Sequence, residues 1–274
     1  MRIKIKTHDF NLEATMDSGQ LFGFTKSLEG IYEGNIGGAR TSFFQKENEL
    51  VVDGGISRHA VEIYFDLGRD LTPVYEILRA DAKLLGIYEK LKGLRLVRQD
   101  PWEGLACFIL SSNNNVKRIQ HIWRNMNEHF ARHRKKGTGG FPTAFEIASS
   151  HESILRKLGL GYRAPFLWAS SKFIANNPEC LRHIREAEYK EACERVIAFP
   201  GIGPKVADCV LLYAFQKYEA FPVDIWILRA IRKLYFNNRK VSERRVREFG
   251  QKRWKQNAGY VQQYIFHGIR TGIL

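Results

Sequence analysis

Polar and apolar residues alternate in the first part of the chain, as they do in strands that are buried on one face only. Residues 2–6, with the sequence Arg-Ile-Lys-Ile-Lys, give the clearest example. Further strand-like runs lie at residues 31–36, 40–44, 50–52 and 61–65. Glycine pairs at Gly37-Gly38 and Gly54-Gly55 interrupt these runs and favour turns. The pattern over residues 1–68 therefore predicts a small antiparallel sheet.

The pattern changes near Leu71, beyond which apolar residues recur at helical spacing. Pro101 follows Asp100, which is typical of a helix start because proline suits the first helical turn. Helices are predicted at residues 101–110, 116–130, 164–175, 189–198, 204–216, 224–235 and 259–269. The predicted fold class is therefore α+β. We expect a β-rich domain with trailing helices over residues 1–96 and a helical region over residues 97–274.

Charge narrows the choice of partner. The 274 residues include 43 Lys plus Arg against 29 Asp plus Glu, a formal net charge of +14. Such an excess favours a polyanionic partner, most often nucleic acid, although a soluble protein can also be basic without one. The basic, glycine-rich segment 132–140 fits a solvated linker better than a second DNA contact.

The cysteines exclude the common metal centres. Cys107, Cys180, Cys193 and Cys209 form no Cys-x-x-Cys pair, so zinc and iron–sulfur sites have no support, and we expect neither a metal nor a cofactor. No secretory signal is evident, and Cys107 and Cys209 lie in apolar segments, which favours reduced thiols in an intracellular protein. No apolar run approaches the roughly 18 residues of a transmembrane helix, so no membrane partner is expected.

One motif suggests a phosphate-binding hairpin. Gly201-Ile202-Gly203 predicts a tight turn, and Pro204 then opens a helix. The two glycines allow close approach of another molecule, and the following helix N-terminus favours an anion. With a helix predicted before it, the segment indicates a helix–hairpin–helix. An ordinary joint between two helices is the alternative.

Lys205 and Asp224 are the candidate catalytic pair. Lys205 lies in the first turn of the helix that Pro204 opens, where the helix dipole favours the neutral, nucleophilic amine over the cation. On its own, Lys205 fits a second phosphate contact better. Asp224 changes this balance, because it precedes another helix as a predicted N-cap and the chain can return there to Lys205. A carboxylate in that cleft would stabilise positive charge developing on a sugar.

Several segments carry a family resemblance. Residues 199–215, followed by Phe221-Pro-Val-Asp224, resemble the helix–hairpin–helix (HhH-GPD) glycosylase superfamily. Within this superfamily, the chain is similar to the eukaryotic-type 8-oxoguanine DNA glycosylase family in four segments, at residues 17–22, 99–118, 158–164 and 259–266. These matches keep the family's order along nearly the whole chain, which makes the resemblance highly specific.

The resemblance implies a bifunctional DNA glycosylase and abasic-site lyase of base excision repair. Such an enzyme flips 8-oxoguanine out of duplex DNA, opposite cytosine, and removes it through a lysine Schiff base followed by β-elimination. Lys205 is the implied nucleophile. Asp224 would stabilise the oxocarbenium-like sugar.

The same resemblance implies a pocket for the lesion base. The backbone carbonyl of Gly19 would accept a hydrogen bond from the ring N–H that separates 8-oxoguanine from guanine. Cys209 and Phe266 would enclose the base, and Gln262 would contact its pairing edge. Without the family, Gly19 fits a plain turn, while Cys209 and Phe266 fit core packing. Cys209 follows Lys205 by one helical turn, so the two residues share a face.

A second set of residues is implied to contact the opposite strand. Asn113, Arg118 and Arg163 resemble the residues that contact the orphaned cytosine, and Tyr162 resembles the wedge that fills the gap. Asparagine and arginine suit base edges, and an aromatic wedge offsets lost stacking. A helix cap for the asparagines and exposed charge for the arginines are the alternatives.

Two positions depart from the family pattern. Trp226 stands where the family often has a histidine, so a phosphate contact is lost or replaced there. Gly23-Phe24 replace a segment in which the family has a tryptophan. Both departures affect the predicted contacts with DNA more than the predicted type of reaction.

Two other functions fit part of the sequence. Relatives that act on adenine mispairs or oxidised pyrimidines often carry a four-cysteine cluster near the C-terminus, whereas no cysteine follows Cys209 in this sequence. Relatives that act on alkylated bases usually lack a lysine at the position of Lys205, so the lysine here argues against that activity. A non-catalytic helix–hairpin–helix module explains the charge but does not require Asp224. We therefore expect a monomeric intracellular enzyme, in the cytoplasm and nucleoid of a prokaryote or the nucleus of a eukaryote. Its expected partner is double-stranded DNA that contains oxidised guanine.

Overall fold

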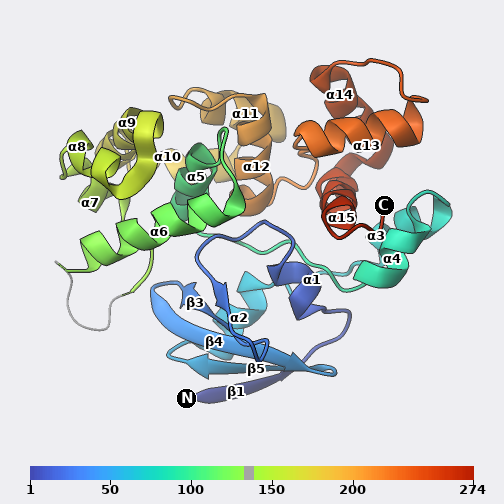
Figure 1. The fold of residues 1–274 in the computed structure, drawn as a ribbon, viewed down its shortest axis with the longest axis horizontal. Coiled ribbons are helices and arrows are strands. Elements are labelled where there is room, and N and C mark those ends of the chain that lie inside the picture. Colours follow the sequence, from blue (N-terminus) through green and yellow to red (C-terminus); the bar gives the residue numbers. More distant parts are fainter. Residues whose placement is uncertain (133–138) are drawn as a thin grey trace.

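The computed structural model describes residues 1–132 and 139–274, and it has an antiparallel sheet on one side of a larger helical body (Figure 1). Most of the basic segment 132–140 thus lies outside the described residues. The sheet has the order β1-β5-β4-β3-β2 with antiparallel neighbours throughout. Its strands are β1 (Arg2–Lys6), β2 (Thr25–Lys26), β3 (Tyr32–Ile36), β4 (Ala39–Lys46) and β5 (Glu49–Gly54).

Helices make up most of the remaining structure, which confirms the predicted α+β class. In the first third of the chain they are α1 (Leu12–Met16), α2 (Arg58–Tyr64), α3 (Thr72–Ala80) and α4 (Leu85–Leu91). The central helices are α5 (Pro101–Leu110), α6 (Val116–Ala131), α7 (Ala144–Ala148), α8 (Glu152–Leu155), η1 (Arg156–Leu160), η2 (Gly161–Arg163), α9 (Ala164–Asn176) and α10 (Cys180–Glu186). The last helices are α11 (Tyr189–Ile197), α12 (Pro204–Phe215), α13 (Ile225–Tyr235), α14 (Glu243–Trp254), η3 (Lys255–Asn257) and α15 (Ala258–Arg270).

One predicted strand is wrong. Residues 61–65 belong to the end of α2 and its C-cap, and the N-cap of the helix is Ser57, whose side chain accepts from the Ala60 amide. The buried residues Val61, Tyr64 and Phe65 follow the helical spacing of three and four. A short apolar run fits both periods, and the capping serine decides between them here.

The two parts of the fold have separate hydrophobic cores. The smaller core lies between the sheet and helices α1 and α2, and Phe43, Leu50 and Val52 are almost fully buried in it. The larger core fills the helical body and also includes residues of α3 and α4, which pack beside α15. The domain boundary that we propose near residue 96 therefore does not coincide with the division between the two cores, because α3 and α4 precede it in the chain but pack in the larger core.

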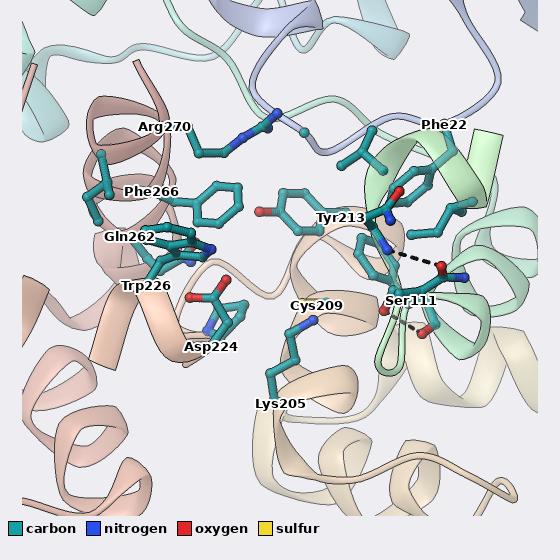
Figure 2. A pocket seen from close by; sticks show the side chains of 18 residues that line it. Phe22, Ser111, Lys205, Cys209, Tyr213, Asp224, Trp226, Gln262, Phe266 and Arg270 are labelled. Carbon is teal, nitrogen blue, oxygen red and sulfur yellow. Dashed lines mark hydrogen bonds between the residues drawn. The ribbon is translucent and has the colours of Figure 1, made fainter. Parts of the chain in front are cut away.

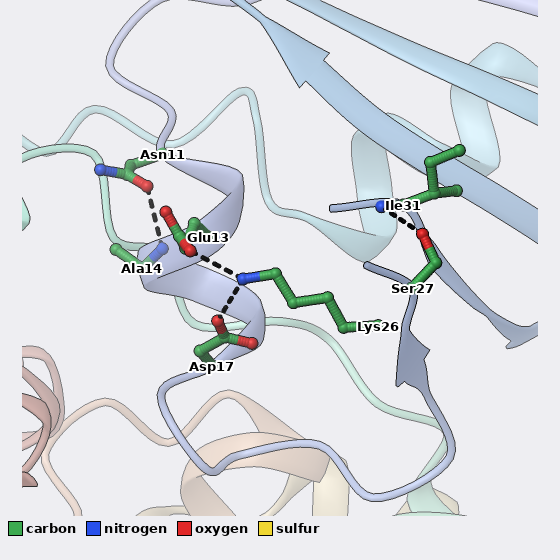
Figure 3. Close-up of polar contacts among 7 residues, drawn as sticks. All are labelled: Asn11, Glu13, Ala14, Asp17, Lys26, Ser27 and Ile31. Carbon is green, nitrogen blue, oxygen red and sulfur yellow. Dashed lines mark hydrogen bonds and ion pairs between the residues drawn. The ribbon is translucent and has the colours of Figure 1, made fainter. Parts of the chain in front are cut away.

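The segment between α1 and β2 is tied to both parts of the fold. The Gln20 side chain donates to the carbonyls of Thr15 and Arg95 and accepts from the Val97 amide, at 2.9 to 3.0 Å. Lys26 of β2 reaches back to form ion pairs with Glu13 and Asp17 (Figure 3). These bonds hold residues 17–20 at the edge of the helical body.

Candidate active site

A cavity of about 460 Å³ lies where residue 19 meets the α5–α6 connection and helices α12, α13 and α15. This volume is within the range of small-molecule sites. Figure 2 shows the Lys205 side chain and the Asp224 carboxylate directed into the cavity from α12 and from the start of α13. The lining residues are Gly19, Phe22, Phe108, Ser111, Asn114, Asn115, Val116, Ile119, Lys205, Cys209, Tyr213, Pro222, Asp224, Trp226, Gln262, Phe266, Ile269 and Arg270.

The hairpin before α12 sets the position of Lys205. Gly201 has a φ of +78°, and a Cβ there would come within 2.4 Å of the Phe166 ring, so the turn packs directly on α9. Ile202 is buried and anchors the turn, while Gly201 and Gly203 are exposed. The N-cap Gly203 has no side chain to cap α12, which leaves first-turn N–H groups for a ligand. Lys205 follows in that first turn.

Asp224 is held by its helix. Its side chain accepts a hydrogen bond from the Ile227 amide at 2.8 Å, as the predicted N-cap should. The cap leaves the second carboxylate oxygen toward the cavity side, where Lys205 also lies. The structure therefore brings together a primary amine and a carboxylate from two helix starts.

Cys209 and Tyr213 continue the cavity wall along α12. Burial raises the pKa of the Cys209 thiol to about 11, against the opposing effect of Lys205, so the thiol is neutral near pH 7. Burial likewise raises the pKa of the Tyr213 hydroxyl well above its ordinary value. Cys209 thus offers a small, uncharged surface, and Tyr213 keeps its proton as a hydrogen-bond donor.

Gln262 faces the cavity from α15 with an unused acceptor. The residue is only 4% exposed, and its Oε1 has no hydrogen-bond partner in the described part of the chain. A buried amide oxygen without a partner is costly, because it gives up its hydrogen bonds to water. A ligand with N–H donors would satisfy it. Phe266, one turn further along α15, adds a ring to the same wall.

A buried chain of hydrogen bonds fixes the turn that contains Gly19. Tyr213 donates to Gln263 Oε1 at 2.5 Å, and Gln263 Nε2 donates to the Ser18 carbonyl at 3.1 Å. Gln263 is fully buried, and Gly19 follows Ser18 with a φ of +83°. The helix that carries Lys205 is thereby connected to the Gly19 turn through α15.

The remaining predicted residues gather around the α5–α6 connection, outside the cavity lining. Arg163 is 4% exposed, and its guanidinium donates to the carbonyls of Ser112 and Asn113. Tyr162 is half-exposed, and its hydroxyl donates to Ser112 at 3.0 Å. Asn113 is exposed with a φ of +47°. The next two residues of this connection, Asn114 and Asn115, line the cavity, so the residues predicted to contact the opposite strand are neighbours of the cavity.

Arg118 lies in the first turn of α6 and is exposed beside this connection. Its backbone amide donates to the Asn115 side chain at 2.9 Å, so Asn115 is the N-cap of α6. The expected cap in the run of three asparagines is thus its last member. The Arg118 side chain forms no ion pair among the described residues.

Both departures from the family pattern have a structural setting. Trp226 is half-exposed and lines the cavity, where its indole supplies an apolar wall. At Gly23, a Cβ would lie 2.8 Å from the indole of Trp123, which comes from α6. Trp123 therefore occupies the space beside Gly23, and a larger residue at 23 would displace it.

Sequence reasoning missed part of the cavity. Tyr213 and Arg270 were not expected there, although each follows a predicted site residue by one helical turn: Cys209 and Phe266, respectively. The spacing of four along a helix was the available signal. Phe22 gave no such signal, because its place depends on the fold of the 17–24 segment.

The described residues contain no cluster of metal ligands. All four cysteines are free, and no group of three or more His, Cys, Asp or Glu side chains in residues 1–132 and 139–274 has the geometry to hold a metal ion. Within the same residues, no helix combines the length and the apolar character needed to cross a bilayer.

Known proteins resemble the chain in sequence and in structure. Residues 2–105 match the family described as 8-oxoguanine DNA glycosylase, N-terminal domain, and residues 106–256 match HhH-GPD superfamily base excision DNA repair proteins. A probable N-glycosylase/DNA lyase of Methanothermobacter thermautotrophicus is 32% identical over 246 residues, which are 79% of this chain and 76% of that protein. The N-glycosylase/DNA lyase OGG1 of Arabidopsis thaliana is 28% identical, over 82% of this chain and 66% of its own length.

Among solved structures, the 8-oxoguanine glycosylase/lyase of Clostridium acetobutylicum superimposes with a TM-score of 0.90 at 29% identity. The match covers 100% of this chain and 99% of that one. That enzyme was solved in complex with double-stranded DNA containing cytosine opposite 8-oxoguanine.

Proposed function

The chain belongs to the HhH-GPD superfamily of base excision DNA repair proteins, and from this premise we propose that it is a DNA N-glycosylase and abasic-site lyase that removes 8-oxoguanine from duplex DNA. One observation carries the proposal: the Lys205 amine and the Asp224 carboxylate face the same cavity, beside the unpartnered amide oxygen of Gln262. These groups suit a flipped nucleotide, with its sugar near the charged pair and its base against Gln262.

In the proposed reaction, the neutral amine of Lys205 attacks C1′ of the flipped nucleotide. The C1′–N9 bond breaks, and its electron pair leaves with the base. The Asp224 carboxylate stabilises the positive charge that develops on the sugar as that bond lengthens. The sugar ring then opens to a Schiff base with Lys205. Loss of a proton from C2′ and departure of the 3′ phosphate complete a β-elimination.

The lesion base is proposed to lie between Cys209 and Phe266. The neutral Cys209 thiol and the Phe266 ring offer apolar contacts for its two faces. Gln262 Oε1 accepts from the N–H groups of the pairing edge, which would satisfy this buried atom. The Gly19 carbonyl accepts from N7–H, which 8-oxoguanine has and guanine lacks.

The surrounding duplex is proposed to contact two surfaces beside the cavity. First-turn N–H groups behind Gly201, Ile202 and Gly203 bind a backbone phosphate, which the dipole of α12 favours. Asn113, Arg118, Tyr162 and Arg163 contact the orphaned cytosine and fill the gap in the stack. The position of these four residues around one connection supports the assignment. We propose that the enzyme works as a monomer inside the cell.

Borohydride trapping tests the proposal directly. The wild-type protein is incubated with a labelled duplex that contains one 8-oxoguanine opposite cytosine, with or without sodium borohydride. We expect a covalent protein–DNA complex that depends on both the lesion and the reductant, because borohydride reduces the Schiff base to a stable amine. An undamaged duplex is the control. Tight binding with neither trapping nor base release would contradict the proposed activity.

We expect that Arg118→Ala relaxes the preference for cytosine opposite the lesion. Loss of one arginine contact to a base edge costs about 1–3 kcal/mol of discrimination, which is roughly 5- to 150-fold in relative rate. Single-turnover excision is measured with each of the four bases opposite 8-oxoguanine. Lys117→Ala, an exposed neighbour on α6, controls for the lost charge. Unchanged ratios in Arg118→Ala would reject this role.

We expect that Gln263→Leu slows excision of 8-oxoguanine more than it slows cleavage at a preformed abasic site. The change releases the Ser18 carbonyl and lets the Gly19 turn shift, while Lys205 and Asp224 stay in place. One misplaced hydrogen bond is worth about 1–3 kcal/mol, so a loss of roughly 10-fold in excision is expected.

Gln251→Leu provides a matched control, because Gln251 also bonds a tyrosine hydroxyl, that of Tyr189, but does not line the cavity. An equal loss of both activities in Gln263→Leu would indicate general destabilisation and contradict a positioning role.

A further inference from the structure

Arg270 adds a cation to the wall of the cavity that carries Gly19 and Phe266. It lies one turn after Phe266 on α15, and Figure 2 shows its side chain extended from that helix toward the segment that contains Gly19. A Cβ built on Gly19 would lie 2.2 Å from Arg270 Nη1, so the guanidinium packs directly on this glycine. The charged residues of the lining are Lys205, Asp224 and Arg270.

The guanidinium has no acidic partner among the described residues. No ion pair there includes Arg270, whereas the surface arginines Arg2 and Arg244 are both paired. The Cζ atom of Arg270 lies 5.6 Å from the centroid of the Phe266 ring. Burial and the neighbouring Arg270 lower the pKa of His267, which favours neutral imidazole there. The positive charge at this wall therefore comes from Arg270, and it is open to a ligand.

If the flipped base is 8-oxoguanine, the position of Arg270 beside Gly19 places the guanidinium near the part of the base that distinguishes the lesion from guanine. The N7–H that Gly19 would bind is flanked on the base by two carbonyl oxygens, O6 and O8. Arginine carries only donors, so it suits an oxygen acceptor next to the donor that the glycine carbonyl takes. We propose that Arg270 is a specificity-determining residue that donates to O8 of the flipped base. This inference rests on the proposed function.

Contact with O8 would also act on the rate. When the C1′–N9 bond breaks, its electron pair goes to N9 and delocalises through C8 onto O8. Lys205 forms the new bond to C1′, and the proton that its nitrogen then releases balances the negative charge on the departing base. A guanidinium at O8 stabilises that charge as it develops, so it assists the transition state more than the bound substrate. Guanine has no O8 and would gain nothing from Arg270.

A contact to a DNA phosphate is the competing role for an exposed arginine at a cavity mouth. The two roles predict different behaviour on DNA that has no base at the target position. Loss of a phosphate contact would weaken activity equally on the abasic duplex and on the 8-oxoguanine duplex, whereas loss of a contact to O8 would affect only the 8-oxoguanine duplex. Loss of a phosphate contact in a variant would also lower the dependence of affinity on salt, because one fewer counterion is released on binding.

The experiment compares wild type, Arg270→Leu and Arg270→Lys on two duplexes. One carries 8-oxoguanine opposite cytosine, and the other carries an abasic site at the same position. We expect Arg270→Leu to lower the single-turnover excision rate by about 10²-fold, as for loss of one donor to a developing anion. Abasic-site cleavage, and affinity for a tetrahydrofuran abasic analogue over a range of salt, stay at the wild-type level. Arg270→Lys recovers part of the rate, because it keeps the charge without the planar fork.

Arg2→Leu is the control for the change in net charge, because Arg2 lies on β1 and does not line the cavity. An unchanged excision rate in Arg270→Leu would overturn the inference. An equal loss on both duplexes with a smaller salt dependence would overturn it in favour of a phosphate contact. Failure of the wild type to release 8-oxoguanine would instead refute the proposed function, and the inference with it.

Discussion

Replacement of Lys205 by glutamine is expected to abolish borohydride trapping and to lower base release by on the order of 10³-fold or more, because removal of an enzymatic nucleophile costs several orders of magnitude. Glutamine keeps a similar length and a polar end but has no lone pair that can form a Schiff base. The residue lies in the first turn of α12, half-buried at the cavity wall, so the substitution disturbs no core packing. Affinity for the damaged duplex should survive.

Three measurements separate chemistry from binding in this variant. Trapping and strand cleavage report on the Schiff base, and a gel-shift titration on the same duplex reports on affinity. Lys190→Gln is a matched control, because Lys190 is exposed on α11 in the same hairpin but does not line the cavity. It should be trapped as efficiently as wild type. A trapped complex at the wild-type level in Lys205→Gln would assign the nucleophile to another residue.

The fold was largely predictable where one periodicity ran over a long segment. Residues 101–110 and the helix after Pro204 were found nearly to the residue, because capping or proline signals coincide with a strong apolar pattern. Residues 61–65 were assigned to a strand because five residues are too few to distinguish the two periods. Helix α14 was missed because its sequence is mainly polar, and its burial depends on Val246, Gly250 and Trp254 against other helices.

The candidate site was predictable to the extent that its residues share a helix or a motif. Lys205 and Cys209 follow from one helix face, and Asp224 follows from its cap. The contact of Trp123 with Gly23 depends on tertiary packing between α6 and the 17–24 segment, which no local pattern encodes. The chain from Tyr213 through Gln263 to Ser18 likewise joins three distant segments. Residues of this kind require the structure.

Asp224 has two separable roles, and two substitutions distinguish them. Its carboxylate caps α13 through Ile227, which is sufficient reason for an aspartate even in a protein without catalytic activity. Asparagine caps a helix about as well as aspartate but has no negative charge. Asp224→Asn therefore removes the proposed chemistry and keeps the cap, whereas Asp224→Ala removes both.

We expect Asp224→Asn to lower the excision rate by about 10²- to 10³-fold, since a carboxylate aimed at the developing charge contributes at least as much as one oxyanion-hole donor. Its thermal unfolding should match wild type. Asp224→Ala should lose activity to a similar degree and also about 1 kcal/mol of stability, the usual cost of a lost N-cap. Single-turnover kinetics and calorimetry measure the two effects separately. If Asp224→Asn kept the wild-type rate while Asp224→Ala lost only stability, the aspartate would be a helix cap alone, and the positive charge on the sugar would have to be stabilised by another group.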